Sequence, residues 1–516
     1  MKFILLLLSL LFDESKSAVF PVVSTKYGPI QGYEYTSPAG YTAQIFKKLP
    51  YARPPLGQMR WRKPELPDRW NQTIDGTFFG PACAQRTVFW AGPATGVSED
   101  CLHINVYTSN ACRKSNSACP VLFILHGGLA IFESPLRFTD DALVDNFVSQ
   151  GLVVVSAAYR LGSFGVMALG DENVLPANLA LHDVVAALKF TRSVIHSFGG
   201  DKDRITILGH STGAQMTLLL ALSPAISPPG ENRLFHSIIA MSGPGRLETE
   251  QRQIERSHLV ANKLGCDGSA TEIIECMRTK SMNEILNVTN YGPSSEEGPL
   301  SITKAGELLP IRSVKEIYES RQPVRLMIGT TLFEFPAPGD ENKVNVVMGI
   351  ENDEECFEKY TKDRQSGYFV PGYNTDSQSI IMTTHLFAKS RAENGGKVYL
   401  YEYDYPEHAK HTQDASFLLG FYPFKKDENE QWLSRVYPRY FANFAKGERP
   451  APDWYQLKPK QMNYYSVNKN ETSGESPQMK KGYQDNITKY YEEMMEYDRQ
   501  LTIERRKVLS APIEYH

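Results

Sequence analysis

The sequence predicts an α/β fold built on a large, mostly parallel sheet with helices on both faces. Two observations carry this prediction. Short apolar runs, typical of buried strands, alternate along the chain with longer segments whose apolar residues recur at helical spacing. The 516 residues are 41% hydrophobic and 22% charged, which is ordinary globular composition and excludes a disordered chain, a coiled coil and a collagen.

The apolar runs and the amphipathic segments occur in the order that strands alternating with helices require. An apolar run of about four to eight residues is typical of a strand buried on both faces, and helical spacing is typical of a covering helix. We therefore predict strands at residues 121–125, 152–159, 204–208, 237–241, 324–329 and 397–405, and helices at 177–196, 215–222 and 490–508. The polar regions 245–320 and 336–395 are interpreted as insertions around the sheet.

The N-terminus indicates export. Lys2 precedes an apolar run over residues 3–12, and polar and small residues follow as far as residue 18. A charged start, a short apolar core and small residues near the cleavage point are typical of a secretory signal peptide, and the run is too short to cross a bilayer. We expect residues 1–17 to be a removable leader and residues 18–516 to form a single secreted domain. A buried N-terminal helix or an anchor is the alternative.

The charge balance excludes one class of partner. Lys and Arg number 55 against 59 Asp and Glu, so the formal net charge is −4 and no basic excess favours nucleic acid. No later stretch is long and apolar enough for a stable membrane span. No two cysteines have C-x-x-C spacing, and we expect neither a metal nor a cofactor.

Seven cysteines and four N-x-S/T sequons fit an exported, disulfide-bonded glycoprotein. The cysteine count is odd, so one thiol is expected to be free. The cysteines are Cys83, Cys101, Cys112, Cys119, Cys266, Cys276 and Cys356. The sequons, and therefore the candidate glycosylation sites, are at Asn71, Asn287, Asn470 and Asn486.

One motif indicates a nucleophilic serine. The only G-x-S-x-G in the chain spans residues 209–213, with a predicted strand leading into it and a predicted helix following. A turn this tight needs small residues on either side of a strained serine; it raises the hydroxyl above the sheet and aims the next helix N-terminus at it. Ser211 is therefore the candidate nucleophile. An ordinary glycine-rich turn is the alternative interpretation.

A serine hydroxyl needs a base to take its proton, and the base needs an acid to orient it. In this strand–turn–helix architecture the chain order is serine, then acid, then histidine, each just beyond a strand. Glu334 stands five residues past Gly329, after the predicted strand at 324–329. The candidate histidines are His385, His408 and His411, and spacing alone does not separate the last two.

Further motifs stand around this serine in a fixed order: LPYARPP at 49–55, SEDCL at 98–102, YRLGSFG at 159–165, FGGD at 198–201 and NFAKG at 443–447. With these motifs the chain resembles the type-B carboxylesterases, the carboxylesterase and cholinesterase family of the α/β-hydrolase superfamily, from about residue 28 to about residue 450. The resemblance implies an α/β-hydrolase fold with insertions around an active-site gorge. It also implies hydrolysis of small carboxylic esters.

The resemblance implies which residues form the triad. The family's acid follows a G-x-x-x-x-E pattern, which falls on Gly329 to Glu334. Its histidine lies nine residues before a glycine in an apolar segment, which His411 fits and His408 does not. The implied roles are Ser211 as nucleophile, Glu334 as acid and His411 as base.

The resemblance also implies disulfides and ion pairs. The family's disulfides fall on Cys83–Cys101 and Cys266–Cys276, and its two structural ion pairs fall on Arg60–Glu99 and Arg160–Asp183. Cys112 and Cys119 are close in sequence and could pair with each other, which would leave Cys356 free.

The oxyanion loop departs from the family pattern. The family has three glycines after the strand at 121–125, and this chain has Gly127, Gly128 and Leu129. The peptide N–H groups of Gly128, Leu129 and Thr212 are the expected oxyanion donors, and losing one such donor costs about 10²–10³ in rate. Leu129 either narrows the site or prevents the backbone angles that glycine favours.

Three more positions depart from the pattern. Glu133 and Phe335 replace family glycines, and Thr212 replaces the alanine that usually follows the serine. Together with Leu129 these changes predict an enzyme with reduced activity or a narrow substrate range. Leu129 and Phe335 also motivate the alternative of a catalytically weak or inactive, cholinesterase-like binding or adhesion protein.

Choline esters are the alternative substrate. A cationic choline head needs an aromatic face, and cholinesterases place a tryptophan ten residues before the cysteine of the SEDCL motif. That position is Ala91 in this chain, and Trp90 is one residue away. A rim or core tryptophan is the competing interpretation of Trp90.

Overall fold

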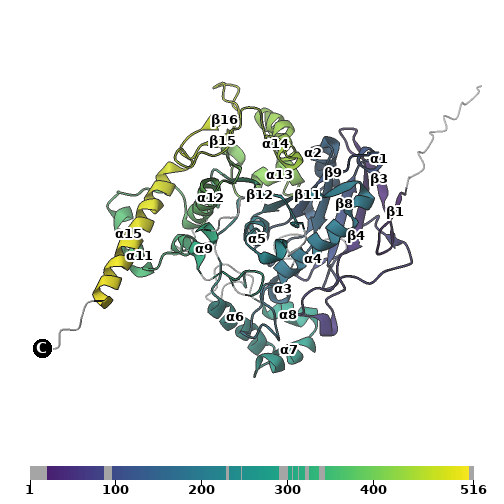
Figure 1. The fold of residues 1–516 in the computed structure, drawn as a ribbon, viewed down its shortest axis with the longest axis horizontal. Helices are drawn as coiled ribbons and strands as arrows, with labels where there is room; N and C mark the ends of the chain where they lie inside the picture. Colours follow the sequence, from purple (N-terminus) through teal and green to yellow (C-terminus); the bar gives the residue numbers. More distant parts are fainter. Residues whose placement is uncertain are drawn as a thin grey trace, which may run out of the picture.

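The computed structural model describes residues 20–86, 96–227, 232–245, 247–289, 300–304, 306–311, 313–319, 325–335 and 343–510 (Figure 1). The predicted leader, residues 1–17, lies outside this part of the chain, as do Trp90 and Ala91.

One large sheet organises the molecule, and within the described residues it has eleven strands in the order β16-β15-β14-β13-β12-β11-β9-β10-β8-β4-β3. All neighbours from β15 to β10 are parallel, and the pairs at both edges are antiparallel. The strands are β3 (Tyr33–Thr36), β4 (Thr42–Pro50), β8 (His103–Thr108), β9 (Cys119–Leu125), β10 (Val153–Ala157), β11 (Gly200–His210), β12 (Ser237–Met241), β13 (Arg325–Thr331), β14 (Val398–Tyr403), β15 (Tyr464–Val467) and β16 (Gln478–Lys480). The predicted α/β class with a mostly parallel sheet is confirmed.

Two small sheets lie beside the large one. The first joins β1 (Val22–Ser24), β2 (Pro29–Gln31) and β5 (Ile74–Asp75), and the second joins β6 (Ala82–Cys83) and β7 (Val97–Ser98). The α-helices are α1 (Asn110–Lys114), α2 (Asp140–Asn146), α3 (Gly162–Gly165), α4 (Leu179–Val194), α5 (Thr212–Leu220), α6 (Glu250–Lys263), α7 (Ala270–Arg278), α8 (Met282–Val288), α9 (Val314–Glu319), α10 (Lys343–Met348), α11 (Asp353–Gln365), α12 (Thr375–Glu393), α13 (Gln413–Leu419), α14 (Glu428–Lys446) and α15 (Asp485–Ser510).

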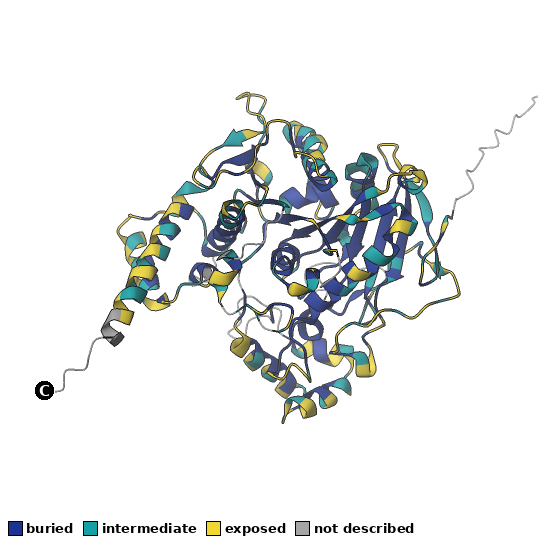
Figure 2. Ribbon diagram, in the orientation of Figure 1, coloured by how far each residue is buried: buried dark blue, intermediate teal, exposed yellow. Residues whose placement is uncertain are grey.

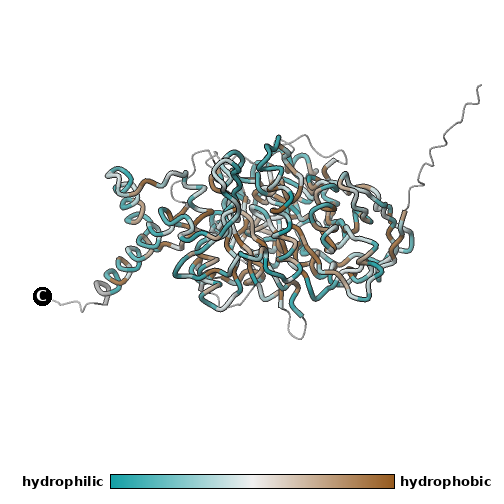
Figure 3. The backbone as a smooth tube through the Cα atoms, turned by 90° about the horizontal axis from the view of Figure 1, so that it is seen from above, coloured by the Kyte–Doolittle hydropathy of each residue, from teal (hydrophilic) through white to brown (hydrophobic). Residues whose placement is uncertain are grey.

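The sheet is covered on both faces, which explains why central strands such as β9, β10 and β12 are apolar at nearly every position. Successive side chains of β9 point to opposite faces, so Phe123 packs in the core that includes Leu188 of α4, and Ile124 packs in the core that includes Phe441 of α14. Strands β10 and β12 are buried throughout, whereas α6, α7 and α15 show exposed faces (Figure 2). Apolar residues accordingly gather in the interior of the chain trace (Figure 3).

The two predicted insertions are helical. Helices α6 to α9 lie between β12 and β13, and helices α10 to α12 lie between β13 and β14. The C-terminal helix α15 packs along α11 and α12 at one end of the molecule (Figure 1). It begins at Asp485, five residues before the predicted start, because the first turn carries polar residues that the apolar pattern did not include.

The predicted covalent and ionic links are present. Disulfides join Cys83 to Cys101, Cys112 to Cys119 and Cys266 to Cys276, and Cys356 is a buried free thiol on α11. The ion pairs Arg60–Glu99 and Arg160–Asp183 are both formed and buried. No helix among the described residues combines the length and the apolar character needed to cross a membrane.

Candidate active site

Ser211 lies in the turn between β11 and α5, at the carboxyl end of the parallel strands. Its backbone has φ 56° and ψ −126°, a strained conformation for a residue with a side chain. Its N–H donates to the Met241 carbonyl over 2.9 Å, and the residue is 7% exposed. Helix α5 begins at the next residue, so its N-terminus faces the serine.

The two glycines of the motif are required by close packing. A Cβ at Gly209 would lie 2.2 Å from the Gly213 carbonyl oxygen, and a Cβ at Gly213 would lie 2.5 Å from the carbonyl oxygens of Leu125 and His126. The end of β9 packs against the turn between β11 and α5. This close packing requires that positions 209 and 213 have no side chain.

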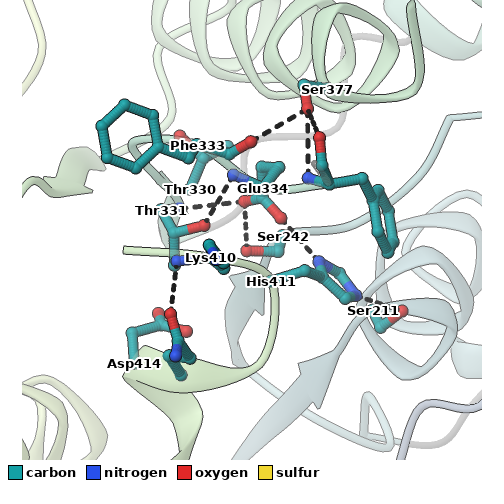
Figure 4. A network of polar contacts seen from close by, with 12 residues as sticks. Ser211, Ser242, Thr330, Thr331, Phe333, Glu334, Ser377, Lys410, His411 and Asp414 are labelled. Carbon is teal, nitrogen blue, oxygen red and sulfur yellow. Dashed lines mark hydrogen bonds and ion pairs between the residues drawn. The ribbon is translucent and has the colours of Figure 1, made fainter. Parts of the chain in front are cut away.

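His411 bridges Ser211 and Glu334 (Figure 4). The Ser211 hydroxyl and His411 Nε2 are 3.0 Å apart, and His411 Nδ1 and Glu334 Oε2 are 2.5 Å apart. The His411 N–H also donates to the Glu334 carbonyl over 2.8 Å, which ties the two loops together. The structure thus brings all three predicted triad residues together. His411 is 77 residues from Glu334 and 200 residues from Ser211 in the sequence.

Glu334 is completely buried just beyond β13 and is held as an acceptor. Its Oε1 accepts hydrogen bonds from the Ser242 hydroxyl at 2.6 Å and from the Thr331 N–H at 2.9 Å, while Oε2 faces His411 (Figure 4). Asp414 is a second buried carboxyl, on α13, and accepts from the Tyr437 hydroxyl at 3.0 Å. Burial, reinforced by the charge of Glu334, raises the pKa of Asp414 to about 7.

The other candidate histidines lie elsewhere. His408 Nδ1 is 2.6 Å from Glu430, whose side chain also belongs to the capping box at the start of α14. His385 lies on α12 and contacts Glu492 of α15 at 2.9 Å. Both histidines therefore join structural elements, and neither is placed beside Ser211.

A cavity of about 150 Å³ opens at Ser211. Its walls are mostly apolar, and a cavity of this size accommodates a group about as large as benzene. It is lined by His126, Gly127, Gly128, Leu129, Phe132, Glu133, Arg137, Phe138, His210, Ser211, Phe335, His411, Thr412, Leu419, Phe421 and Tyr422.

The oxyanion loop follows β9 and faces this cavity. Leu129 has φ 56°, so its side chain does not keep the backbone out of the left-handed region that glycine favours. The Leu129 side chain is 41% exposed and lines the cavity. Within the described part of the chain, the N–H groups of Gly128, Leu129 and Thr212 donate to no other group.

Two rings hold the His411 imidazole in place. Phe335 lies on one side with its ring centroid 4.3 Å from that of His411, and His210 lies at 5.0 Å. His210 is buried, and burial, followed by the proximity of His411, lowers its pKa well below the ordinary value. His210 is therefore a neutral wall of the site at physiological pH.

Several residues of this region were not predicted from the sequence. Ser242 directly follows β12, so its position just beyond a parallel strand was the available signal, as it was for Glu334. Gln85 and Tyr422, which contact Glu133, carried no such signal, because they come from segments far from Glu133 in sequence.

Among the described residues, no group of three or more His, Cys, Asp and Glu side chains could hold a metal ion. A parallel sheet with a strained serine between strand and helix is the architecture of the α/β-hydrolases. The model of the carboxylesterase family matches residues 20–491 of this chain.

Comparison with individual esterases also places the chain in this family. The chain is 35% identical to gut esterase 1 of Caenorhabditis briggsae over 444 residues, which is 84% of this chain and 73% of that protein. It is 34% identical to juvenile hormone esterase of Tribolium castaneum over 267 residues, 50% of this chain and 43% of that protein. A solved structure of PNB esterase superposes with a TM-score of 0.74 at 23% identity, covering 91% of this chain and 99% of that one, and shows the fold.

The chain belongs to the carboxylesterase family and has the α/β-hydrolase fold. The family supports hydrolysis of carboxylic esters as its activity, with small-molecule esters as the class of substrate.

Proposed function

We propose that the protein is a secreted serine hydrolase that cleaves carboxylic esters through an acyl-enzyme on Ser211. The observation that carries the proposal is the position of His411, with Nε2 3.0 Å from the Ser211 hydroxyl and Nδ1 2.5 Å from Glu334. This is the hydrogen-bonded order that an activated serine needs.

In the first half of the reaction, His411 Nε2 takes the hydroxyl proton as Ser211 Oγ attacks the ester carbonyl carbon. The tetrahedral oxyanion accepts hydrogen bonds from the N–H groups of Gly128, Leu129 and Thr212. The buried Glu334 carboxylate orients the imidazole and balances the charge of the imidazolium. Collapse breaks the bond to the alcohol, which leaves with the proton from His411.

In the second half, His411 takes a proton from water and the hydroxide attacks the acyl carbon. A second tetrahedral oxyanion forms in the same hole and collapses. The bond to Ser211 Oγ breaks, the serine regains its proton from His411, and the carboxylic acid departs. These steps leave every proton accounted for and use only side chains of this chain and water.

The pocket suggests which esters fit. A cavity of about 150 Å³ with mostly apolar walls favours a short or aromatic acyl group. Leu129 lines the cavity and has the left-handed φ that a glycine would adopt. We therefore infer that it restricts the substrate range and that its N–H remains an oxyanion donor.

Serine labelling tests this function. Ser211 should react stoichiometrically with an organophosphate, and Ser211→Ala should lose at least about 10³-fold in hydrolysis of a short acyl ester. Ser434→Ala on α14, outside the pocket lining, is the matched control and should keep full activity. Equal rates for the wild type and Ser211→Ala would favour the binding or adhesion role instead.

We also infer export and a single catalytic domain over residues 18–516 after removal of residues 1–17. The three disulfides support an oxidising compartment. Of the four sequon asparagines, Asn71, Asn287 and Asn486 are exposed and Asn470 is half-buried. The Asn486 Nδ2 donates to the Val370 carbonyl over 2.8 Å. Mass spectrometry of the secreted protein gives both the N-terminus and the glycosylated residues.

A further inference from the structure

The oxyanion loop carries unusual backbone strain. Between β9 and α2, three residues with side chains have left-handed φ values: Leu129 at 56°, Ala130 at 59° and Glu133 at 83°. Such conformations cost free energy for L-residues and persist where surrounding contacts hold them. The contacts that hold this loop therefore bear on where its peptide N–H groups point.

The backbone of Glu133 is held by a buried side chain from a distant segment. The Glu133 N–H donates to Gln85 Oε1 over 2.9 Å, and Gln85 Nε2 donates to the Glu133 carbonyl over 2.8 Å. Gln85 is 1% exposed and also donates to the carbonyl of Cys83, two residues away and joined by a disulfide to Cys101. Both peptide groups of Glu133 are thus fixed to a cross-linked segment.

The side chain of Glu133 is held from the opposite side. Its Oε1 accepts a hydrogen bond from the Tyr422 hydroxyl, and Arg137 lies over the Tyr422 ring at 4.4 Å with its Nε 3.9 Å from Glu133 Oε2. Tyr422 follows α13, the helix that begins two residues after His411. The Glu133 side chain therefore connects the oxyanion loop to the segment that carries the histidine.

Glu133 also packs closely against Gly128, one of the expected oxyanion donors. A Cβ placed on Gly128 would lie 2.9 Å from the Glu133 Cβ and 2.1 Å from the Phe132 carbonyl oxygen, so the loop closes tightly on itself here. The Gly128 carbonyl accepts from the N–H groups of Ile131 and Phe132. A shift of Glu133 would consequently reorient the peptide groups of Gly128 and Leu129.

We propose that Glu133 is a positioning residue, through which Gln85 and Tyr422 hold the N–H groups of Gly128 and Leu129 toward the ester oxyanion. The proposal deepens the serine-hydrolase function and rests on it. It also assigns a role to Glu133 in a loop position where the family has glycine.

The test compares variants at both ends of this connection. Tyr422→Phe keeps the ring over which Arg137 lies and removes the hydroxyl, and Gln85→Leu removes both contacts to the Glu133 backbone. Each should lower kcat by about tenfold or more with KM changed by less than about twofold, because the loss falls on the transition state. Glu133→Gln keeps an acceptor oxygen for Tyr422 and should retain most of the kcat.

Two readouts separate positioning from a structural role. Affinity for a trifluoromethyl ketone, which forms an oxyanion on Ser211, should fall in parallel with kcat/KM. Rates are expressed per Ser211 labelled by an organophosphate at completion, so unfolded protein does not count. Tyr405→Phe is the matched control, because Tyr405 makes the same kind of hydrogen bond to Asp427 at the start of α14, outside the pocket lining.

Tyr422→Phe with the wild-type kcat per labelled site and wild-type ketone affinity would overturn the positioning role. So would an equal loss in Tyr405→Phe. Failure of the proposed function is distinguishable, since Ser211→Ala would then hydrolyse the ester as fast as the wild type.

Discussion

Leu129 occupies the third position of the oxyanion loop with the backbone conformation of a glycine. Because its N–H is already placed by that conformation, replacing the side chain adds no donor. We expect kcat of Leu129→Gly to rise far less than the 10²–10³-fold that a recovered donor gives. Esters with bulky acyl groups should instead show a lower KM, because a side chain that lines the cavity is gone.

The stability of Leu129→Gly follows from two opposing effects. Glycine relieves the left-handed strain of about 1–2 kcal/mol, and its greater freedom in the unfolded chain costs about 0.5–1 kcal/mol. The free energy of unfolding should therefore rise by about 0–1.5 kcal/mol, measured by urea denaturation. A kcat increase of 10² or more across all acyl lengths would show that Leu129 misdirects its N–H in the wild type.

Some catalytic residues could be identified from the sequence alone, and others could not. Ser211 was predictable because its turn has a steric requirement that only small neighbours satisfy. His408 and His411 follow the same strand, so spacing left them equivalent, and the family pattern favoured His411. What separates them physically is the contact of His408 with Glu430, which joins positions 22 residues apart and has no local signature.

At the scale of elements, the central strands were predictable and the edges were not. Strands covered on both faces must be apolar at nearly every position, as β9, β10 and β12 are. Strand β3 at the sheet edge is only partly buried, and short strands such as β6 and β7 have too few residues to show a period. Their pairing depends on tertiary contacts, which a local pattern does not contain.

The Cys112–Cys119 disulfide links α1 to the start of β9, the strand that leads into the oxyanion loop. It closes a loop with a sequence separation of 7, and a loop this short predicts about 2–3 kcal/mol of stabilisation through the unfolded chain. The double variant Cys112→Ser, Cys119→Ser should lose that much free energy of unfolding and keep its kcat at 25 °C. Urea titrations at equal protein concentration measure the difference.

The matched comparison is the pair Cys266→Ser, Cys276→Ser, whose disulfide links the loop after α6 to α7 in the insertion between β12 and β13. A similar loss is expected there, because loop-closure entropy changes slowly with loop length. An unchanged free energy of unfolding in either double variant would contradict the expectation.

At the scale of the whole molecule, the sheet order brings the site together. Strands β11, β12, β13 and β14 are adjacent and parallel, so the segments after them reach the same edge of the sheet. Ser211, Ser242, Glu334 and His411 each come from one of those segments. The alternation of strands and helices predicted this convergence, whereas the helical insertions that surround it carried no pattern specifying their packing.

Among the described residues, four buried or mostly buried histidines give the molecule a pH dependence of stability. Burial lowers the pKa of His103, His126 and His182 to about 4 and lowers the pKa of His210 well below its ordinary value. The unfolded chain takes up protons at these positions below pH 6.5, the ordinary pKa of histidine, and the folded chain does not. Their neutral forms therefore stabilise the fold above pH 6.5, and that stabilisation is lost as the pH falls toward 4.

Three buried carboxyls of the described residues act in the opposite direction. Burial raises the pKa of Asp414 and of Glu402 to about 7 and also raises the pKa of Glu133, so their contribution is greatest at low pH and is lost as the pH rises through the raised pKa values. Four histidines outnumber these three carboxyls between pH 4 and 6.5. We expect the free energy of unfolding to decrease on acidification from pH 7 to pH 5.

His103 provides the test of this sign. It is mostly buried near Lys48, with its Nε2 4.0 Å from Asp100. Its Nδ1 makes no hydrogen bond among the described residues, so a neutral replacement removes a titration without removing a partner of Nδ1. His103→Gln should flatten the dependence of unfolding free energy on pH by up to one proton, which is about 1.4 kcal/mol per pH unit, over pH 5–6.5. Urea denaturation at half-unit pH steps measures both slopes. A wild type that gains stability on acidification, or a variant with the wild-type slope, would contradict the assignment, because a histidine kept neutral by burial must bind its proton more weakly in the folded state than in the unfolded chain.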